Sequence, residues 1–396
     1  MKKSVSLAIA LAMALSLSAC GENSEGGAAE AEVTTAAKTE AVRNETENDE
    51  TTSDETTPPE ETTTITEEVT KPAIEVVEPA SEDFEYKYDA ALKGAVITRY
   101  NGEATAIRIP TELDGDPVVE FELYSEDITH VEIPDGFTSI GRNAFRGCSD
   151  LQSVIIPDSV TEIGEMAFNG CEKLEKIAIP NSVTRIWKYA FGDCDALTEV
   201  TIPNSVKEFG YYEVGEYFYC GESVFTNCDN LVKVNMPEKM ELEYLGGFYG
   251  CPSLKEITIP SGIKGISESA FCGCKSLEII IIPDGTETIG KLAFSDCANL
   301  KEITIPGSVK YIDEGAFSGC TGLKEVTLPN GVILNHCVFY KCTGLRNVTL
   351  PDDIKKDLSD FFDGCEGLTV TYKGKEYNYT NFYDLYDAIP YKEYIW

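Results

Sequence analysis

The feature that most constrains this chain is a 23-residue repeat that runs through most of its length. One proline per repeat marks the period, at positions 134, 157, 180, 203, 237, 260, 283, 306, 329 and 351. The step is 23 residues except after Pro203, where it is 34, and after Pro329, where it is 22. A constant period of this size is typical of a solenoid, in which each small unit stacks on the next. The 396 residues therefore need not divide into several globular domains.

Each repeat reads L-x-x-I-x-I-P, then a loop, then I-G-x-x-A-F-x-G-C. Alternating apolar positions, such as Val154 and Ile156, suit a short strand with one face turned inward. Proline ends the strand, because it cannot donate a hydrogen bond to the ladder. We expect about eleven coils with a parallel ladder, a single helical turn at A-F-x-G-C, and a continuous buried stack of rings from Phe145 to Phe362.

Ten of the cysteines occupy one column of the repeat. A metal site would need clustered ligands of suitable spacing, and neighbouring rungs about 4.8 Å apart exceed the ~3.8 Å between Cβ atoms that disulfides prefer. We therefore expect small buried thiols, and neither a metal nor a cofactor. Cys220, Cys272 and Cys337 fall outside the column, and a disulfide among them stays open. The column consists of Cys148, Cys171, Cys194, Cys228, Cys251, Cys274, Cys297, Cys320, Cys342 and Cys365.

The repeats resemble the BspA-like, treponemal-type leucine-rich repeats found on surface proteins of many host-associated bacteria, over about residues 100–370. The resemblance implies an α/β-type solenoid, a right-handed superhelix of short parallel strands with N- and C-terminal caps. Residues 100–121 resemble the opening coil of that family, so 84–133 are expected to be the N-terminal cap and first coil. Residues 134–369 are the repeats. Residues 370–396 resemble a closing hairpin, turning at Lys373-Gly374, and a helix.

The N-terminal residues 1–19 have the character of a signal peptide: a basic start, a short apolar stretch and the sequence Leu17-Ser18-Ala19-Cys20. This ending resembles a bacterial lipobox, which implies that Cys20 is lipidated; a plain secretory signal is the alternative. Residues 20–83 are rich in Thr, Glu and Pro and are expected to form a disordered acidic spacer. The chain is therefore predicted to be exported, lipid-anchored to the membrane and displayed at the cell surface.

Composition and motifs exclude several classes of function. A formal charge of −36 argues against binding nucleic acid and against docking on an anionic membrane through basic residues. The two histidines, His130 and His336, form no recognisable catalytic or metal-binding motif with other residues. We therefore assign no catalytic residue, and an enzyme is the least favoured interpretation.

An insertion at 211–222 accounts for the 34-residue step and contains the sequence YYEVGEYFY. Aligned by their repeats, Trp187 and Tyr189 of the previous coil match Gly210 and Tyr212, and Tyr244 of the next coil matches Gly210. Because they come from successive coils, we expect these aromatic rings to gather in one place. Insertions in repeat proteins often lie on the binding face, and exposed Tyr and Trp are enriched where proteins bind, so the rings are candidates for ligand contact. The alternative is that the rings pack together only to hold the insertion. The candidate ligand-contacting rings are Trp187, Tyr189, Tyr211, Tyr212, Tyr217, Tyr219 and Tyr244.

Outward strand positions should form the concave face, where solenoids usually bind partners. Ile279 and Ile281 both point outward there, beside Glu256 and Glu302, and an exposed apolar patch can mark a contact. The alternative is a tolerated pair of β-branched residues. The family resemblance implies non-catalytic, adhesin-like binding of a protein on a host or neighbouring cell. Carbohydrate capture, with the aromatic insertion as a stacking platform, is the second interpretation.

Overall fold

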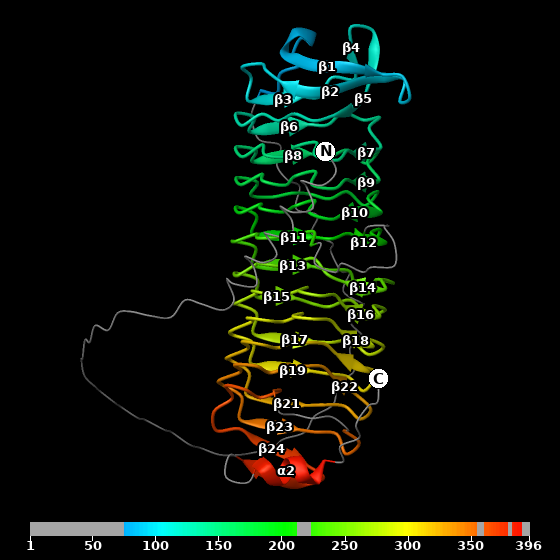
Figure 1. Cartoon of the computed structure of the whole chain (residues 1–396). Coiled ribbons are helices and arrows are strands. Elements are labelled where there is room, and N and C mark those ends of the chain that lie inside the picture. Colours follow the sequence, from blue (N-terminus) through cyan, green and yellow to red (C-terminus); the bar gives the residue numbers. More distant parts are fainter. Residues whose placement is uncertain (1–74, 212–222, 355–359, 379–381, 390–396) are drawn as a thin grey trace, which may run out of the picture. The chain divides into compact units, whose positions relative to one another are not determined.

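The computed structural model describes residues 75–211, 223–354, 360–378 and 382–389 (Figure 1). The chain divides into two units, Met1–Thr66 and Glu67–Trp396, and all described residues lie in the second. The predicted signal peptide, Cys20 and the spacer up to residue 74 lie outside the described residues. The second unit is a parallel β-solenoid of about 11 turns that repeats about every 23 residues, which confirms the predicted solenoid.

One side of most coils carries the predicted short strand, although the coil at 176–178 forms none, and together these strands form the surface that we call the strand face (Figure 1). The pairing is parallel and in register, as between β6 and β8, where Val131 lies opposite Val154. The central residue of most of these strands is buried, while the flanking residues point outward. The strands are β3 (Ala106–Arg108), β6 (His130–Glu132), β8 (Ser153–Ile155), β11 (Glu199–Thr201), β13 (Lys233–Asn235), β15 (Glu256–Ile257), β17 (Ile279–Ile281), β19 (Glu302–Thr304), β21 (Glu325–Thr327), β23 (Asn347–Thr349) and β24 (Thr369–Tyr372).

A second parallel ladder, which the sequence analysis did not predict, follows the proline loops; we call it the lateral ladder (Figure 1). It forms two sheets, β7-β9-β10-β12 and β14-β16-β18-β20-β22, and the insertion at 211–222 separates them in sequence. Its strands are β7 (Ser139–Ile140), β9 (Glu162–Ile163), β10 (Arg185–Trp187), β12 (Glu208–Tyr211), β14 (Tyr244–Leu245), β16 (Gly265–Ile266), β18 (Thr288–Ile289), β20 (Tyr311–Ile312) and β22 (Ile333–Leu334).

The A-F-x-G-C segment is not helical, so the predicted helical turn is wrong. In the first repeat Asn143 and Gly147, on either side of Phe145, have left-handed backbone conformations with φ of 62° and 73°. The Phe145 N–H then bonds the Ala167 carbonyl of the next coil at 2.7 Å, not a carbonyl of its own coil. Among the described residues the only α-helix is α2 (Phe382–Ala388), so the predicted α/β class is not confirmed and the coils are built of strands and turns.

The phenylalanine of each coil lies in the core, as predicted. Neighbouring rings stack nearly parallel, with centroids 5.0–5.9 Å apart and interplanar angles of at most 14°. Such contacts add to the free energy that burial of the rings already supplies. The stacked residues are Phe145, Phe168, Phe191, Phe225, Phe248, Phe271, Phe294, Phe317, Phe339 and Phe362.

The cysteine column consists of free thiols, as predicted, and each thiol has a specific partner. From Cys171 to Cys365, every Sγ lies 3.0–3.2 Å from the carbonyl oxygen of the phenylalanine in the preceding coil. That oxygen also accepts an N–H of its own coil, such as Cys148 N–H on Phe145 at 3.1 Å. The thiol therefore satisfies the second lone pair of a buried carbonyl. Among the described residues Cys272 and Cys337 form no disulfide either, and Cys220 lies outside them.

Non-repeating elements lie at the two ends of the repeats. Before them, β1 (Phe84–Asp89), β2 (Gly94–Tyr100), β5 (Asp116–Phe121) and β4 (Glu112–Leu113) form one sheet in that order. Val77 pairs with Ile107 of β3, and η1 spans Ser81–Asp83, so the last residues of the predicted spacer belong to the folded unit. After the repeats, β24 and β25 (Lys375–Asn378) form a hairpin that turns at Lys373-Gly374. That these elements cap the solenoid stays a prediction.

Candidate ligand-binding surface

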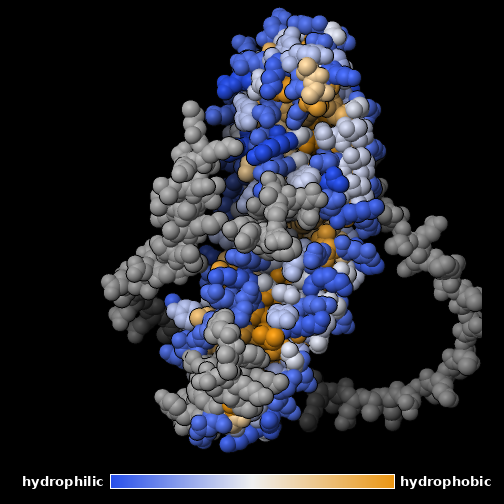
Figure 2. Space-filling model, turned by 45° about the vertical axis from the view of Figure 1, so that its right-hand side comes forward, coloured by the Kyte–Doolittle hydropathy of each residue, from blue (hydrophilic) through white to orange (hydrophobic). Residues whose placement is uncertain are grey.

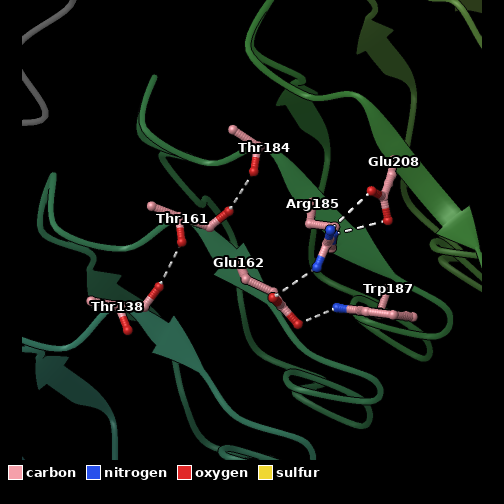
Figure 3. A network of polar contacts seen from close by, with 7 residues as sticks. All are labelled: Thr138, Thr161, Glu162, Thr184, Arg185, Trp187 and Glu208. Atoms are coloured by element: carbon pink, nitrogen blue, oxygen red, sulfur yellow. Dashed lines mark hydrogen bonds and ion pairs between the residues drawn. The ribbon is translucent and has the colours of Figure 1, made fainter.

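Trp187 lies at the end of β10 within a network of charged side chains (Figure 3). Its indole N–H donates to Glu162, and the guanidinium of Arg185 lies 5.9 Å from the ring centroid, within the range of a cation–π contact. Arg185 also donates to both carboxylate oxygens of Glu208, at 3.0 and 2.9 Å, and lies 3.6 Å from Glu162. These contacts fix the orientation of a half-buried indole that keeps part of its surface accessible.

A line of threonines holds the strands beneath this network in register (Figure 3). The Thr161 hydroxyl donates to the Thr138 carbonyl at 3.1 Å, and the Thr184 hydroxyl donates to the Thr161 carbonyl at 3.2 Å. Each threonine directly precedes the charged or polar residue that begins its strand. The spacing of Glu162 and Arg185 is therefore set by backbone pairing as well as by their own ion pair.

The insertion leaves and rejoins the solenoid beside Trp187 and Tyr189. Tyr211 lies opposite Trp187 in the β10–β12 pair, and Gly210, with φ of 73°, forms a bulge. Trp187 therefore faces Tyr211 and not Gly210, which corrects the sequence alignment. At the other end, the Ser223 carbonyl accepts the Tyr189 N–H at 2.9 Å. Tyr212, Tyr217, Tyr219 and the side chain of Tyr211 lie outside the described part of the chain.

Tyr189 itself has a left-handed backbone with φ of 55°, a strained conformation for a residue with a bulky side chain. The buried hydroxyl of Ser223 accepts the Tyr249 N–H at 3.4 Å, so Ser223 links the coil of Tyr189 to the coil that follows the insertion. Strain of this kind persists only where the surroundings hold the backbone in place. Tyr189 is therefore anchored at the point where the insertion ends.

The structure does not bring Tyr244 into the position predicted for it. In the β14–β16 pair Tyr244 lies opposite Gly265, which places it in the column of Arg185 and Glu208 and not in that of Gly210. The coil has a longer loop after Pro237 than its neighbours, so counting from the proline gives the wrong register. The Tyr244 ring covers the Gly265 backbone, where an added Cβ would lie 2.7 Å from ring carbons. A side chain at position 265 would therefore displace this ring.

Ile279 and Ile281 point outward from β17, as predicted, and are 54% and 66% exposed. In the pair with β19 they lie opposite Glu302 and Thr304. Ile155 of β8 is also exposed, at 41%, but it stands alone on its strand. The exposed isoleucine pair is therefore a distinct apolar area on the strand face.

A groove of about 380 Å³ lies next to this pair, where strand pairing is interrupted between β19 and β21. Ile303, the central residue of β19, is only half-buried, whereas Val326 of β21 is buried. The groove thus exposes part of an aliphatic side chain that in most neighbouring coils is covered. Its lining residues are Ile303, Thr304, Ile305, Glu325, Val326, Thr327, Pro329, Asn347 and Thr349.

Two carboxylates, Glu302 and Glu325, flank the groove. Among the described residues, neither Glu302 nor Glu325 takes part in an ion pair, although both are exposed on the strand face. Glu256, two coils before Glu302, lies 3.8 Å from Lys233. Sequence reasoning singled out neither the groove nor Glu325, because a gap between two similar strands leaves no distinctive residue pattern.

The lateral ladder carries a separate pair of exposed residues, Tyr311 and Ile333, which lie opposite each other in β20 and β22 and are about half exposed. Figure 2 turns this side of the molecule forward and shows hydrophobic areas that are small and separated by hydrophilic residues. The strand face differs from the lateral ladder in that its exposed apolar residues, Ile279 and Ile281, lie beside a groove.

The two histidines lie far apart in the sequence and have local partners. His130 Nδ1 lies 2.8 Å from the Thr129 hydroxyl, and burial lowers the pKa of the imidazole. His336 Nδ1 lies 2.6 Å from Asp360. Burial, with nearby Asp360, raises the pKa of the adjacent Cys337 thiol, which opposes formation of a thiolate nucleophile. In the described ranges no three His, Cys, Asp or Glu residues are grouped so as to hold a metal ion.

None of the helices in the described residues has the length and apolar character needed to cross a membrane.

Comparison with known proteins agrees with this architecture. The family model described as "BspA type Leucine rich repeat region (6 copies)" matches residues 119–241 and 243–369, which together are more than half of the chain. No curated protein matches the chain.

Solved structures of bacterial repeat proteins are similar to the chain. A leucine rich cell surface protein from Faecalibacterium prausnitzii is 25% identical over 81% of this chain and 100% of its own, with a TM-score of 0.43. A leucine-rich repeat protein from Bacteroides ovatus is 25% identical over 73% of this chain and 92% of its own, with a TM-score of 0.38.

The leucine-rich repeat protein of T. pallidum is 27% identical over 62% of this chain and 91% of its own, with a TM-score of 0.36. Because all three TM-scores are below 0.5, the assignment rests on the family model and on the repeat itself. The matched residues contain the proline, phenylalanine and cysteine columns described above. The chain therefore belongs to the BspA-type leucine-rich repeat family.

Proposed function

We propose that the protein is a non-catalytic binding protein of the cell surface that recognises a protein on a host or neighbouring cell. One observation carries the proposal: the strand face presents an exposed isoleucine pair beside a groove. The scaffold that presents them is a solenoid of the BspA-type leucine-rich repeat family. Solenoids commonly bind proteins through such a face. A contact surface of this type needs no reactive group.

The chemistry of the side chains supports binding over catalysis. Most thiols of the cysteine column lie in the core, where burial raises the pKa and keeps them protonated, and Cys148 has a pKa of about 11. The exposed His336–Asp360 pair lies next to Cys337, a thiol whose pKa is raised. A nucleophile would need the opposite shift.

We further propose that Cys20 is lipidated, that residues 20–74 act as a spacer, and that the terminal sheet and hairpin cap the repeats. The lipobox-like sequence before Cys20 and the acidic, Thr-rich composition that follows support the first two points. The open ends of a solenoid would otherwise expose core and strand edges, which supports the third.

A glycan is the second candidate ligand, and the Trp187 network favours it. Sugars stack on aromatic rings, and here Glu162 and Arg185 hold a half-buried indole at the root of the aromatic insertion. A charged group next to an accessible ring offers hydrogen bonds to hydroxyls while the ring supplies an apolar face.

A binding screen tests both candidates. The full chain would be presented to arrays of extracellular-matrix proteins, mucins and glycans, and saturable binding would be measured at physiological salt. We expect binding to at least one protein that does not require its glycans. Binding that is lost when glycans are removed would favour the second candidate, and no saturable binding to either array would overturn the proposed function.

A further inference from the structure

The strand face from β17 to β23 combines an exposed apolar pair, a groove and carboxylates that have no cationic partner among the described residues; we call this area the β17–β23 site. We infer that the β17–β23 site binds an extended segment of the partner protein that carries both aliphatic and basic side chains. This inference rests on the proposed function, since it names the chemistry of the partner that the strand face recognises.

The apolar contacts come from neighbouring coils. Ile279 and Ile281 are 54% and 66% exposed, and Ile303 is partly open to the groove. Most other coils place polar or charged residues at the two outward positions, as in Glu302 and Thr304 of β19. Covering the isoleucines removes apolar surface from water and therefore favours association. Aliphatic side chains of the partner can contact the pair and enter the groove.

The charged contacts come from the same coils. Glu302 lies opposite Ile279, and Glu325 lines the groove; among the described residues neither is paired with a cation. The chain as a whole carries a formal charge of −36. A basic partner segment supplies the missing cations and is attracted at long range by this charge, whereas an acidic segment is repelled.

The strand geometry favours an extended segment. In an extended chain every second side chain faces the same way, and parallel strands are about 4.8 Å apart. A segment that crosses from β17 to β23 meets the isoleucine pair on β17, then Glu302 on β19, and then the groove, which Glu325 of β21 lines. The facing positions of the segment are thus aliphatic and basic in turn, with the pattern aliphatic-x-basic-x.

The first experiment measures binding of synthetic peptides to the full chain by fluorescence anisotropy. The probe is a twelve-residue peptide with three copies of Leu-Ser-Lys-Ser. One control peptide replaces each lysine by glutamate and another replaces each leucine by serine. We expect saturable binding of the probe that weakens as salt is raised, and binding about ten-fold weaker for either control peptide.

The second experiment uses matched variants of the protein. Ile279→Asn/Ile281→Thr gives β17 the outward residues of β23, Asn347 and Thr349, so the strand should still form. Ile155→Thr is the control. It removes an exposed isoleucine at the same repeat position as Ile281, but on β8, outside the β17–β23 site. We expect about ten-fold weaker probe binding for the double variant and for Glu302→Gln/Glu325→Gln, and unchanged binding for Ile155→Thr.

The outcomes separate this inference from the proposed function. Equal probe affinity in the double variant and the unmodified protein, equal loss in Ile155→Thr, or no preference for the probe over its controls would overturn the inference. If the array screen still finds a protein ligand in that case, the proposed function stands and the partner has another chemistry. Probe binding that follows the expected order supports the inference even where the array contains no ligand.

Discussion

At the residue scale, the phenylalanine and cysteine of each coil form one hydrogen-bonded unit with the next coil. The phenylalanine ring stacks on its neighbours, while its carbonyl accepts a thiol from the following coil at 3.0–3.2 Å. Cysteine suits this position because it is small, tolerates burial and donates a weak hydrogen bond. The sequence predicted that both columns are buried, but nothing in a repeat pattern reveals that the thiol serves a backbone oxygen.

Removal of one ring from the stack should destabilise the solenoid strongly. Phe294 is fully buried, with neighbouring ring centroids at 5.2 and 5.5 Å, so Phe294→Ala should lower the free energy of unfolding by about 3–5 kcal/mol. Urea unfolding followed by circular dichroism measures the change. Tyr311→Ala, at a half-exposed position, is the control and should change it by about 0.5 kcal/mol or less. Similar effects of both substitutions would contradict the buried stack.

Stability should fall in alkaline solution because of the buried thiols. Burial raises the pKa of Cys148 to about 11 and also raises the pKa of Cys297, whereas an unfolded thiol titrates near pH 8.5. Below that pH both states are protonated and stability is intact. Above it the unfolded state loses protons first, so each thiol whose pKa is raised in this way lowers the free energy of unfolding by roughly 1 kcal/mol per pH unit.

Urea unfolding at pH values from 7 to 10 tests this expectation. Cys297→Ser is the matched variant, because its hydroxyl can donate to the Phe271 carbonyl but does not titrate in this range. Its stability should decline less steeply than that of the unmodified chain. Parallel declines in the two proteins would show that other groups, such as tyrosines, cause the alkaline loss.

At the element scale, the structure differs from the sequence-based expectation where side chains of similar kind allow more than one register. The strand face follows from alternating apolar residues, and Ile279 and Ile281 point outward as that pattern predicts. The lateral ladder has only two to four residues per strand and gives too short a pattern to recognise. The prediction for Tyr244 was wrong because a longer loop shifts its strand, and the groove lies where strand pairing is interrupted between β19 and β21, which the repeat pattern does not reveal.

The insertion should be dispensable for folding. Replacement of Tyr211–Glu222 by a single residue restores the 23-residue step and keeps Ser223, whose carbonyl accepts the Tyr189 N–H. We expect a thermal midpoint close to that of the unmodified chain, because insertions in repeat proteins map to loops on one face. Circular dichroism measures the midpoint, and the glycan array reports whether any glycan binding is lost.

A second variant, with twelve Gly and Ser residues in place of 211–222, keeps the length but removes the rings. Loss of glycan binding in both variants, with retained folding, would assign that binding to the aromatic insertion. Unfolding of the shortened chain would instead show that the rings serve to pack the insertion against the coils.

At the scale of the whole molecule, the terminal segments determine where the repeats act. If Cys20 is lipidated, Cys20→Ser should release the protein from the membrane fraction and abolish incorporation of labelled fatty acid, because the lipid chains supply the anchoring free energy. Cys220→Ser, which leaves the lipobox unchanged, is the control and should remain in the membrane fraction. Membrane association and labelling that survive in Cys20→Ser would contradict lipid anchoring at this residue.

The one-thiol-per-coil arrangement has a practical consequence for studying how the solenoid opens. A buried, protonated thiol does not react with alkylating reagents, so a cysteine becomes labelled only when its own coil opens. The order in which the buried thiols from Cys148 to Cys342 are alkylated in mild denaturant would rank the coils by their opening free energies. Mass spectrometry of the labelled peptides could therefore map local unfolding along the chain at single-coil resolution, with natural reporters at almost every coil.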